Sequence, residues 1–253
     1  MKLRDKVVVI TGSGGGIGEA CARRFTAEGA KVIVTDINPD GVERVSYDIG
    51  SVGLSGDITD PATVDAVADL ARRTYGDIDI WFSNAGYAGP RQPADLQPDE
   101  IWELSWHLHV MSHVHAVRAV LPAMLERGDG YLLQTASVVA LAIQPDKAAY
   151  TVTKHAALAL AEWLAATYRS KGIKVSCFCP GAMLTPMLLT NDFPADHPML
   201  KTAATPEQVA DRLVHAIDDE RFLILDSDVG TESLTAKASD YEKWVTDIAR
   251  GRK

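Results

Sequence analysis

Residues 7–18 read VVVITGSGGGIG, an apolar run that passes directly into a glycine-rich turn. The run is rich in Val, which predicts a strand buried within a sheet. In the turn, Gly12, Gly16 and Gly18 follow Thr11 at a spacing that allows a helix to begin at once. Glycines permit a tight turn and let main-chain N–H groups approach a pyrophosphate, which then lies at the positive end of the helix. The stretch therefore predicts a dinucleotide-binding turn, and a glycine-rich turn without a ligand is the alternative.

The rest of the chain repeats this alternation of short apolar runs and longer helical patterns. Such alternation is typical of α/β proteins, so we expect a doubly wound parallel sheet of about seven strands with helices on both faces. No linker, repeat or low-complexity stretch divides residues 1–253, which predicts a single domain. The expected strands are residues 6–10, 31–35, 52–55, 78–82, 131–135, 173–178 and 221–225, and the expected helices are 18–28, 61–75, 98–127, 148–171 and 206–217.

The balance of charge argues against two classes of partner. The 253 residues include 25 basic and 34 acidic side chains, a net charge of −9, and 47% of them are hydrophobic. An acidic surface repels nucleic-acid phosphates and anionic lipid, so we expect neither nucleic acid nor a membrane as a partner. The N-terminus lacks the apolar region of a signal peptide, and no apolar run approaches the roughly 20 residues that span a bilayer. We therefore expect a soluble, cytoplasmic protein.

Two segments depart from the regular alternation. Residues 183–204 contain several prolines with apolar side chains between them and are too long for an ordinary connection, so we expect a substrate lid. Its apolar side chains predict a small apolar or aromatic substrate. They are Met183, Leu184, Met187, Leu188, Leu189 and Phe193. Residues 234–249 predict an amphipathic C-terminal helix, which packs on its own subunit in the favoured interpretation and on a second subunit in the alternative.

Asp36, at the end of the second expected strand, bears on the choice of cofactor. It stands eighteen residues after Gly18, where a carboxylate can accept hydrogen bonds from the hydroxyls of an adenosine ribose and repel a 2′-phosphate. The next residue, Ile37, offers no positive charge to a phosphate. The pattern therefore predicts NAD in preference to NADP. Asp36 could instead cap a helix that begins near Pro39.

Ser137, Tyr150 and Lys154 form a candidate proton-transfer set. A free tyrosine has a pKa of about 10 and is a poor base at neutral pH. Lys154 lies one turn after Tyr150 on the same helix face, so its ammonium group can stabilise the phenolate and lower that pKa. Ser137 follows an expected strand and can hydrogen-bond a substrate oxygen while Tyr150 takes or gives the proton. The alternative is a buried tyrosine with an exposed lysine on an ordinary helix.

Together, in this order and spacing, the glycine-rich turn and the Ser137, Tyr150 and Lys154 set resemble the short-chain dehydrogenase/reductase family. The resemblance covers about residues 5–218 and implies a Rossmann-type fold. It also implies an oxidoreductase that interconverts a secondary alcohol and a ketone with a nicotinamide cofactor, with Tyr150 as the acid and base. We expect that cofactor to be NAD, for the reason given by Asp36.

Three further motifs match the family. Gly56-Asp57-Ile58 resembles the segment with an adenine-contacting aspartate, Asn84-Ala85-Gly86 the segment that stabilises the sheet along the cofactor, and residues 180–185 the segment whose threonine binds the nicotinamide carboxamide. The resemblance implies a set of cofactor-binding residues. They are Gly12, Ser13, Gly16, Ile17, Gly18, Asp36, Ile37, Asp57, Ile58, Asn84, Ala85, Gly86, Tyr150, Lys154, Pro180, Gly181, Met183 and Thr185.

One position departs from the family pattern. Relatives carry an asparagine that completes a proton relay through water to the lysine, and the count back from Leu121-Pro122 puts His109 there. Histidine can also bind a water, so His109 is a candidate fourth catalytic residue, and a packing role is the alternative. His109 and His113 are one helical turn apart, but no nearby carboxylate or cysteine completes a ligand set, so we expect no metal. Cys177 and Cys179 lie in an apolar strand and are expected to pack in the core.

The resemblance also bears on assembly and on rival functions. In the family, helices equivalent to residues 98–127 and 148–171 form a four-helix dimer bundle, so we expect a homodimer or homotetramer. One alternative function is a 3-oxoacyl-thioester reductase, which would ordinarily use NADPH and is therefore disfavoured by Asp36. The other is a catalytically weak NAD-binding sensor or scaffold, which only His109 supports.

Overall fold

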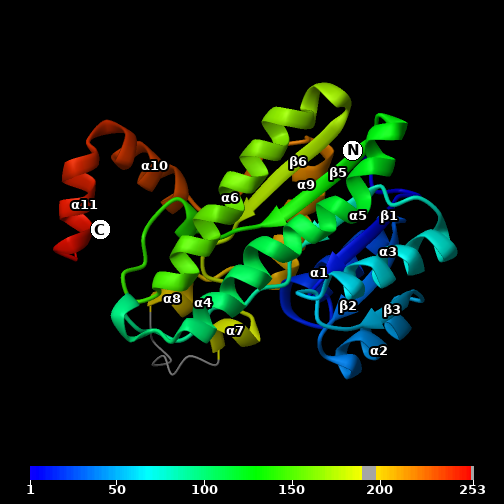
Figure 1. The fold of residues 1–253 in the computed structure, drawn as a ribbon, viewed down its shortest axis with the longest axis horizontal. Coiled ribbons are helices and arrows are strands. Elements are labelled where there is room, and N and C mark those ends of the chain that lie inside the picture. The colour runs from blue at the N-terminus through cyan, green and yellow to red at the C-terminus, as the bar shows by residue number, and fades with distance from the viewer. Residues whose placement is uncertain (190–197, 252–253) are drawn as a thin grey trace.

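A seven-stranded parallel sheet forms the centre of the computed structural model, which describes residues 1–189 and 198–251 (Figure 1). The strand order is β3-β2-β1-β4-β5-β6-β7, so the order reverses at β1 and β4. The strands are β1 Val7–Thr11, β2 Lys31–Asp36, β3 Val52–Ser55, β4 Ile80–Ser83, β5 Gly130–Thr135, β6 Ile173–Cys179 and β7 Leu223–Leu225. The expected doubly wound α/β fold is confirmed.

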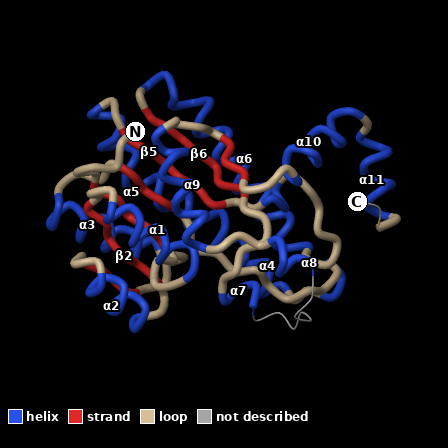
Figure 2. The backbone as a smooth tube through the Cα atoms, turned by 180° about the vertical axis from the view of Figure 1, so that it is seen from behind, coloured by secondary structure: helices blue, strands red, loops and turns tan. Residues whose placement is uncertain are grey.

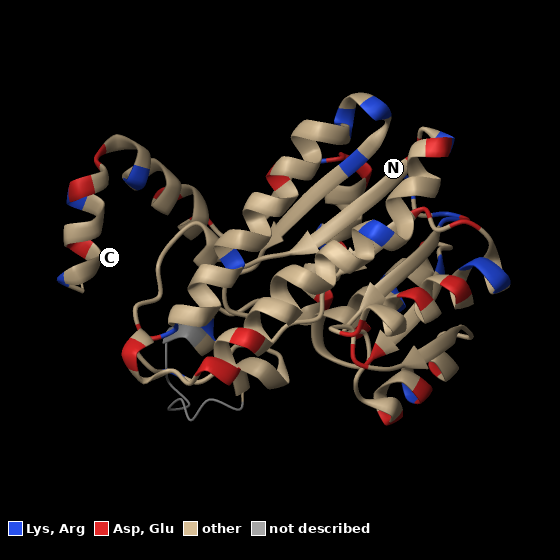
Figure 3. Ribbon diagram, in the orientation of Figure 1, with Lys and Arg blue, Asp and Glu red and all other residues tan. Residues whose placement is uncertain are grey.

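Helices cover both faces of the sheet, and short ones occur in the connections. They are α1 Gly16–Ala27, α2 Pro39–Asp48, α3 Pro61–Tyr75, α4 Asp99–Trp106, α5 Ser112–Arg127, α6 Ala148–Tyr168, α7 Pro186–Leu189, α8 Pro198–Thr202, α9 Pro206–Asp218, α10 Val229–Ser239 and α11 Tyr241–Ala249. No helix in the described ranges is long and apolar enough to cross a membrane. Charged residues gather on helices and connections and are sparse on the strands (Figure 3).

The alternation of side chains along each strand divides the core into two layers. Val9 of β1 packs with α3, α5 and α6, whereas its neighbours Val8 and Ile10 pack with α1 and α9. All three side chains are fully buried. Because both faces of such a strand are covered, its side chains are apolar at successive positions and do not alternate with polar ones. These strands therefore form continuous apolar runs in the sequence.

The structure divides two helices that the sequence pattern joined. Residues 98–127 form α4, a π-helical turn at His107–Met111 and α5, instead of one regular helix. The C-terminal helix expected at residues 234–249 is two helices, α10 and α11. Asp240 has an extended backbone (φ −157°), and its side chain accepts the Lys243 N–H at 2.9 Å, so it ends one helix and caps the next.

The pair α10 and α11 lies to one side of the sheet (Figures 1 and 2). A hydrogen bond of 3.0 Å from the Ser233 hydroxyl to the Leu141 carbonyl joins α10 to the rest of the fold. Within the pair, Trp244 is buried against Tyr241, and the Lys237 ammonium lies 4.9 Å from the Trp244 ring centroid. The two helices therefore pack largely on each other.

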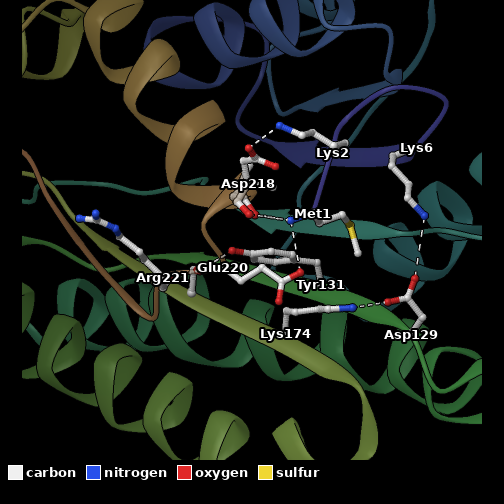
Figure 4. Close-up of polar contacts among 11 residues, drawn as sticks. Met1, Lys2, Lys6, Asp129, Tyr131, Lys174, Asp218, Glu220 and Arg221 are labelled. Atoms are coloured by element: carbon white, nitrogen blue, oxygen red, sulfur yellow. Dashed lines mark hydrogen bonds and ion pairs between the residues drawn. The ribbon is translucent and has the colours of Figure 1, made fainter.

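Ionic and polar contacts hold the amino ends of the strands, at the edge opposite the predicted site (Figure 4). Asp79 accepts the Lys6 ammonium at 3.0 Å and the Val7 N–H at 2.9 Å, which fixes the entry to β1. The buried Tyr131 hydroxyl lies 2.6 Å from that of Ser176 and joins β5 to β6. These groups satisfy one another's hydrogen bonds at the amino ends of the strands.

Candidate active site

The glycine-rich turn brings main chain against main chain at the end of β1. A Cβ on Gly18 would lie 2.1 Å from the Gly12 carbonyl oxygen, so any side chain there would push α1 away from the turn. Gly12 has φ +66°, and a Cβ on it would lie 2.9 Å from Ala85 Cα. Gly15, the N-cap of α1, provides no side-chain hydrogen bond to the first helical N–H groups. The geometry thus leaves a positive helix end open at the point where the strand order reverses between β1 and β4, which fits a pyrophosphate.

Ser13 belongs to the structure of this turn. Its hydroxyl donates to the Ile10 carbonyl at 2.7 Å and accepts the Thr35 N–H at 3.0 Å, and its own N–H donates to the Thr35 carbonyl at 3.1 Å. The side chain is fully buried. These bonds use the polar groups of Ser13 to tie the turn to β2. Ile17, immediately before the packed Gly18, lies against the core layer of α1 and α9.

Asp36 lies beside the turn at the carboxyl end of β2. One of its carboxylate oxygens accepts the Gly14 N–H at 3.0 Å, and the other accepts the Asn38 N–H at 3.0 Å. The cap of α2 is Asn38, whose side chain accepts from Asp40 and Gly41, so Asp36 does not have the capping role considered as its alternative. Ile37 is 72% exposed and adds no positive charge beside the carboxylate.

The motifs after β3 and β4 continue along the same edge. Asp57 is exposed and accepts the N–H and hydroxyl of Thr59, whereas Ile58 is buried in the core. Asn84 joins β4 to β1 because its N–H donates to the Thr11 hydroxyl at 2.9 Å and its side-chain amide donates to the Thr11 carbonyl at 3.0 Å. Ala85 donates its N–H to the same hydroxyl at 3.0 Å.

The three predicted proton-transfer residues meet at the carboxyl end of β5. Ser137 lies two residues after this strand and is buried, and its hydroxyl accepts the Val139 N–H at 3.2 Å. Tyr150 and Lys154 come from the first turns of α6. Burial raises the pKa of Tyr150, and a hydrogen bond with the Ser137 side chain acts in the opposite direction. Ser137 and Tyr150 therefore face each other.

Lys154 is a buried cation held by main chain. It is 2% exposed, and its ammonium donates to the Thr135 carbonyl at 3.0 Å and lies 5.7 Å from the Tyr150 ring centroid. Burial lowers the pKa of Lys154 to about 8. This position excludes the alternative in which the lysine is an exposed residue of an ordinary helix.

His109 lies in the π-helical turn and is fully buried beside these groups. Its Nε2 accepts the Tyr87 N–H at 3.1 Å, so the proton is on Nδ1, which lies 2.9 Å from the Thr153 hydroxyl. Its ring meets the Tyr150 ring edge-on at 5.5 Å. Burial, with help from the charge of Lys154, holds the pKa of His109 well below its usual value. Both ring nitrogens of this neutral imidazole are hydrogen-bonded, so His109 holds Tyr87 and Thr153 in place.

Gly86 separates His109 from Lys154. A Cβ on Gly86 would lie 3.7 Å from the Lys154 ammonium and 3.8 Å from His109 Nε2. The glycine therefore leaves room between the two groups. His113, one turn further along, is also buried, and its two ring nitrogens and the Gln134 side-chain oxygen have no hydrogen-bond partner among the residues described.

The two ends of the segment predicted as a lid, residues 183–204, lie side by side. Met183 and Ala204 form an isolated parallel bridge, and the Leu184 N–H donates to the Ala204 carbonyl at 2.9 Å. Phe193 of the predicted lid lies outside the described residues. Thr185 lies over the glycine-rich turn, because its Cγ2 would be 3.5 Å from a Cβ on Gly16.

Two residues beside this segment hold its entry in place. The Pro180 carbonyl accepts the Val138 N–H at 2.8 Å, and the Gly181 N–H donates to the Asp226 carboxylate at 2.9 Å. They link the end of β6 to the segment after β5 and to the residues after β7. Together with Thr185, they complete the convergence of the predicted cofactor motifs at one edge of the sheet.

Some residues that shape the site were not anticipated from the sequence. Gln97 is buried and accepts the Ala149 N–H at 2.9 Å, so it caps the start of α6 from a distant segment. Thr153 carries the hydrogen bond from His109 and donates to the Ala149 carbonyl at 2.7 Å. Lys147, just before α6, is buried against the segment after β4. The contacts of Gln97 with Ala149, of His109 with Thr153 and of Lys147 with Ala88 join segments remote in sequence, so no local pattern marks them.

Comparisons with known proteins agree with this geometry. A family model described as short chain dehydrogenase matches residues 6–193. The chain is 36% identical over 231 residues to a 1-deoxy-11-beta-hydroxypentalenate dehydrogenase of Streptomyces exfoliatus, and the match covers 88% of this chain and 84% of that protein.

Solved structures show the same fold at full length. A 3-ketoacyl-(acyl-carrier-protein) reductase from Brucella melitensis, complexed with NADH, gives a TM-score of 0.82 at 28% identity and covers 88% of this chain and 97% of its own. A short chain dehydrogenase/reductase from Burkholderia phymatum, in complex with NAD, gives 0.83 at 26% identity and covers 100% of this chain and 97% of its own. The likeness thus extends well beyond the glycine-rich turn.

The buried His113 predicts a dependence of stability on acid. Burial lowers the pKa of His113 in the fold from 6.5 to about 3, so between these values the unfolded chain binds a proton that the folded chain does not. The free energy of unfolding should fall as the pH is lowered through this range. His113→Leu should make its slope shallower by about 1.4 kcal/mol per pH unit. Denaturant titrations at several pH values between 3 and 6.5 measure this slope, with the exposed His215→Leu as control. Equal slopes in the wild type, His113→Leu and His215→Leu would contradict the lowered pKa of His113.

Proposed function

Because the chain belongs to the short-chain dehydrogenase family, we propose that it is an NAD-dependent oxidoreductase that interconverts a secondary alcohol and a ketone, with Tyr150 as the acid and base. The observation that carries the proposal is the convergence of Ser137, Tyr150 and the buried Lys154 beside an open glycine-rich helix end. Each half of this arrangement would be weak support alone. Together they bring a proton-transfer group to a dinucleotide site.

The protein's own groups move and hold the proton. In alcohol oxidation, ionised Tyr150 accepts the proton of the substrate hydroxyl, and Ser137 hydrogen-bonds the same oxygen and keeps it in reach. Lys154 lowers the free energy of the phenolate by its charge. NAD, when bound, supplies the acceptor for the hydride. In ketone reduction the same tyrosine returns the proton.

Asp36 supports NAD as the cofactor. Its carboxylate ends β2 next to the turn, with the exposed Ile37 following it and no positive charge at that residue. A 2′-phosphate would meet like charge there. Gly12, Gly16 and Gly18 would admit the pyrophosphate, and Thr185 would contact the nicotinamide end. Two similar structures, one with NADH and one with NAD, add support by likeness.

A small apolar or aromatic alcohol is the proposed substrate. Met183 is buried, whereas Met187 and Leu189 are 44% and 60% exposed at the segment predicted as a lid. The relative from Streptomyces exfoliatus is named as the dehydrogenase of a hydroxypentalenate, a compound that carries a hydroxyl group. A second candidate, 3-oxoacyl-thioester reduction, is favoured by the likeness to the Brucella melitensis reductase complexed with NADH. Turnover assays with secondary alcohols, ketones and 3-oxoacyl thioesters separate the two candidates.

Tyr150→Phe tests the proposed acid and base. The variant loses only the phenolic oxygen, so turnover should fall by about a factor of 100 to 10,000 while NAD affinity is kept. Lys154→Ala should weaken both turnover and NAD binding. The measurements are steady-state rates and NAD titrations by calorimetry. Near wild-type turnover by Tyr150→Phe would show that another group transfers the proton, and a wild type that binds NAD but turns over no alcohol, ketone or thioester would favour a sensor or scaffold.

Asp36 predicts the cofactor preference. Wild-type protein should bind NAD at least 100-fold more tightly than NADP, a rough figure for one like-charge contact. Asp36→Ala combined with Ile37→Arg should narrow or invert that ratio. Asp40→Ala, which removes an exposed carboxylate of α2, is the matched control and should leave the ratio unchanged. Equal affinity of the wild type for NAD and NADP would refute the role of Asp36.

We also propose at least a homodimer, formed through α4, α5 and α6. Trp163 is 57% exposed on α6, and Leu104 and Trp106 are 43% and 44% exposed on α4, which is a large apolar area for free helix faces. Trp163→Glu should weaken dimerisation by about 30-fold, as expected for an aromatic hot spot. Light scattering over a dilution series measures this, with exposed Tyr47→Glu on α2 as control. A wild-type monomer at micromolar concentration would contradict the proposal.

A further inference from the structure

Lys147 is a second buried lysine beside Tyr150. It is 6% exposed, and its ammonium donates to the carbonyls of Ala88 and Gly89 at 3.2 and 3.4 Å. Buried lysines are rare unless they are paired, because removing a charge from water is costly. Within the described part of the chain, no carboxylate forms an ion pair with Lys147, and the adjacent Asp146 pairs with Arg91 at 3.0 Å.

The two lysines lie at nearly equal distances from the tyrosine ring. The ammonium of Lys147 is 5.8 Å from the Tyr150 ring centroid and that of Lys154 is 5.7 Å away. Lys147 is the residue just before α6, three positions before Tyr150, and Lys154 is one helical turn after it. Two positive groups therefore lie within 6 Å of the Tyr150 ring centroid.

Three other groups face Tyr150. The imidazole of His109 from the π-helical turn and the Ser137 hydroxyl from the segment after β5 carry no charge, whereas Cys179 from β6 acts to raise the pKa of Tyr150 and so opposes the two lysines. Around Lys147 itself, burial lowers its pKa first, and Arg91 adds to that effect while Asp146 opposes it. The carbonyls of Ala88 and Gly89 hold the ammonium without cancelling its charge.

We propose that Lys147 is a positioning residue for the proton transfer, whose ammonium stabilises the Tyr150 phenolate together with that of Lys154. The proposal rests on the proposed function, in which Tyr150 is the base. An opposite charge within about 6 Å lowers the pKa of an acid by about 1 unit or more. A tyrosine flanked by two ammonium groups is ionised at lower pH than one beside a single lysine. The second lysine therefore favours alcohol oxidation closer to neutral pH.

A purely structural role is the alternative for Lys147, because its hydrogen bonds to Ala88 and Gly89 also hold that segment in place. Two substitutions separate the structural role from the electrostatic one. Lys147→Gln keeps a donor for these carbonyls and removes the charge, whereas Lys147→Arg keeps the charge. Lys171→Gln is the matched control, because Lys171 is an exposed lysine just after α6 whose ammonium lies 5.2 Å from the Tyr168 ring centroid. Circular dichroism confirms that each variant folds, and Lys147→Met replaces Lys147→Gln if that variant does not.

Ionisation of Tyr150 is measured directly by ultraviolet absorbance against pH, with and without NAD. Subtracting the titration of Tyr150→Phe in each background isolates this tyrosine from the other six of the 7 in the chain. Lys147→Gln should raise the midpoint by about 1 pH unit, and Lys147→Arg and Lys171→Gln should leave it in place. The acidic limb of kcat/KM for alcohol oxidation should move to higher pH by the same amount.

The proposal would be overturned if Lys147→Gln left the midpoint of the Tyr150 titration unchanged and reduced activity equally at every pH. Lys147 would then only hold the segment of Ala88 and Gly89 in place. An equal midpoint shift in Lys147→Arg would also overturn the proposal, because the charge is retained there. If no alcohol or ketone is turned over by the wild type, the proposed function fails, but the titration still decides whether Lys147 acts on the phenol.

Discussion

The burial of the Lys154 ammonium is the constraint on which the rest of the site depends. A charge that is 2% exposed is tolerated because the Thr135 carbonyl at the carboxyl end of β5 holds it, and burial lowers its pKa to about 8. The nearby histidines adapt to that charge. His109 and His113 both have lowered pKa values, through burial first and the charge of Lys154 second. The positive charge therefore remains concentrated next to Tyr150.

The sequence predicted those parts of the fold and site that depend on short-range spacing. Parallel strands buried on both faces read as apolar runs, so the positions of the seven strands were predicted to within about two residues. The boundaries of α1, α3, α6 and α9 were predicted to within about three residues. Tyr150 and Lys154 are four residues apart and share a helix face, and Ser137 lies two residues after the end of β5. Gly18 was predicted as part of the dinucleotide-binding turn, whereas its close approach to the Gly12 carbonyl is a finding of the structure.

The parts that the sequence did not predict depend on contacts between remote segments or on local breaks in a continuous pattern. The apolar spacing continues through His107–Met111, so nothing marked the π-helical turn that carries His109. Asp240 ends α10 and caps α11. The apolar residues on either side of it keep helical spacing, so the sequence pattern did not reveal this break. A helix near Pro39 was considered only as one that Asp36 could cap, and the extent of α2 was not predicted, although Asn38 and Pro39 are a recognisable start signal. Gln97 reaches α6 only because the segment after β4 folds back over its first turn.

The partners of the two lysines explain why both charges remain available to Tyr150. Lys154 donates to the Thr135 carbonyl and Lys147 to the carbonyls of Ala88 and Gly89, and neither pairs with a carboxylate in the ranges that the structure describes. A carboxylate would hold an ammonium group more strongly, but its negative charge would also disfavour a phenolate nearby. A main-chain carbonyl satisfies the donor and leaves the net positive charge intact. The choice of acceptor, as much as the presence of the lysines, thus determines the electrostatic field at the tyrosine.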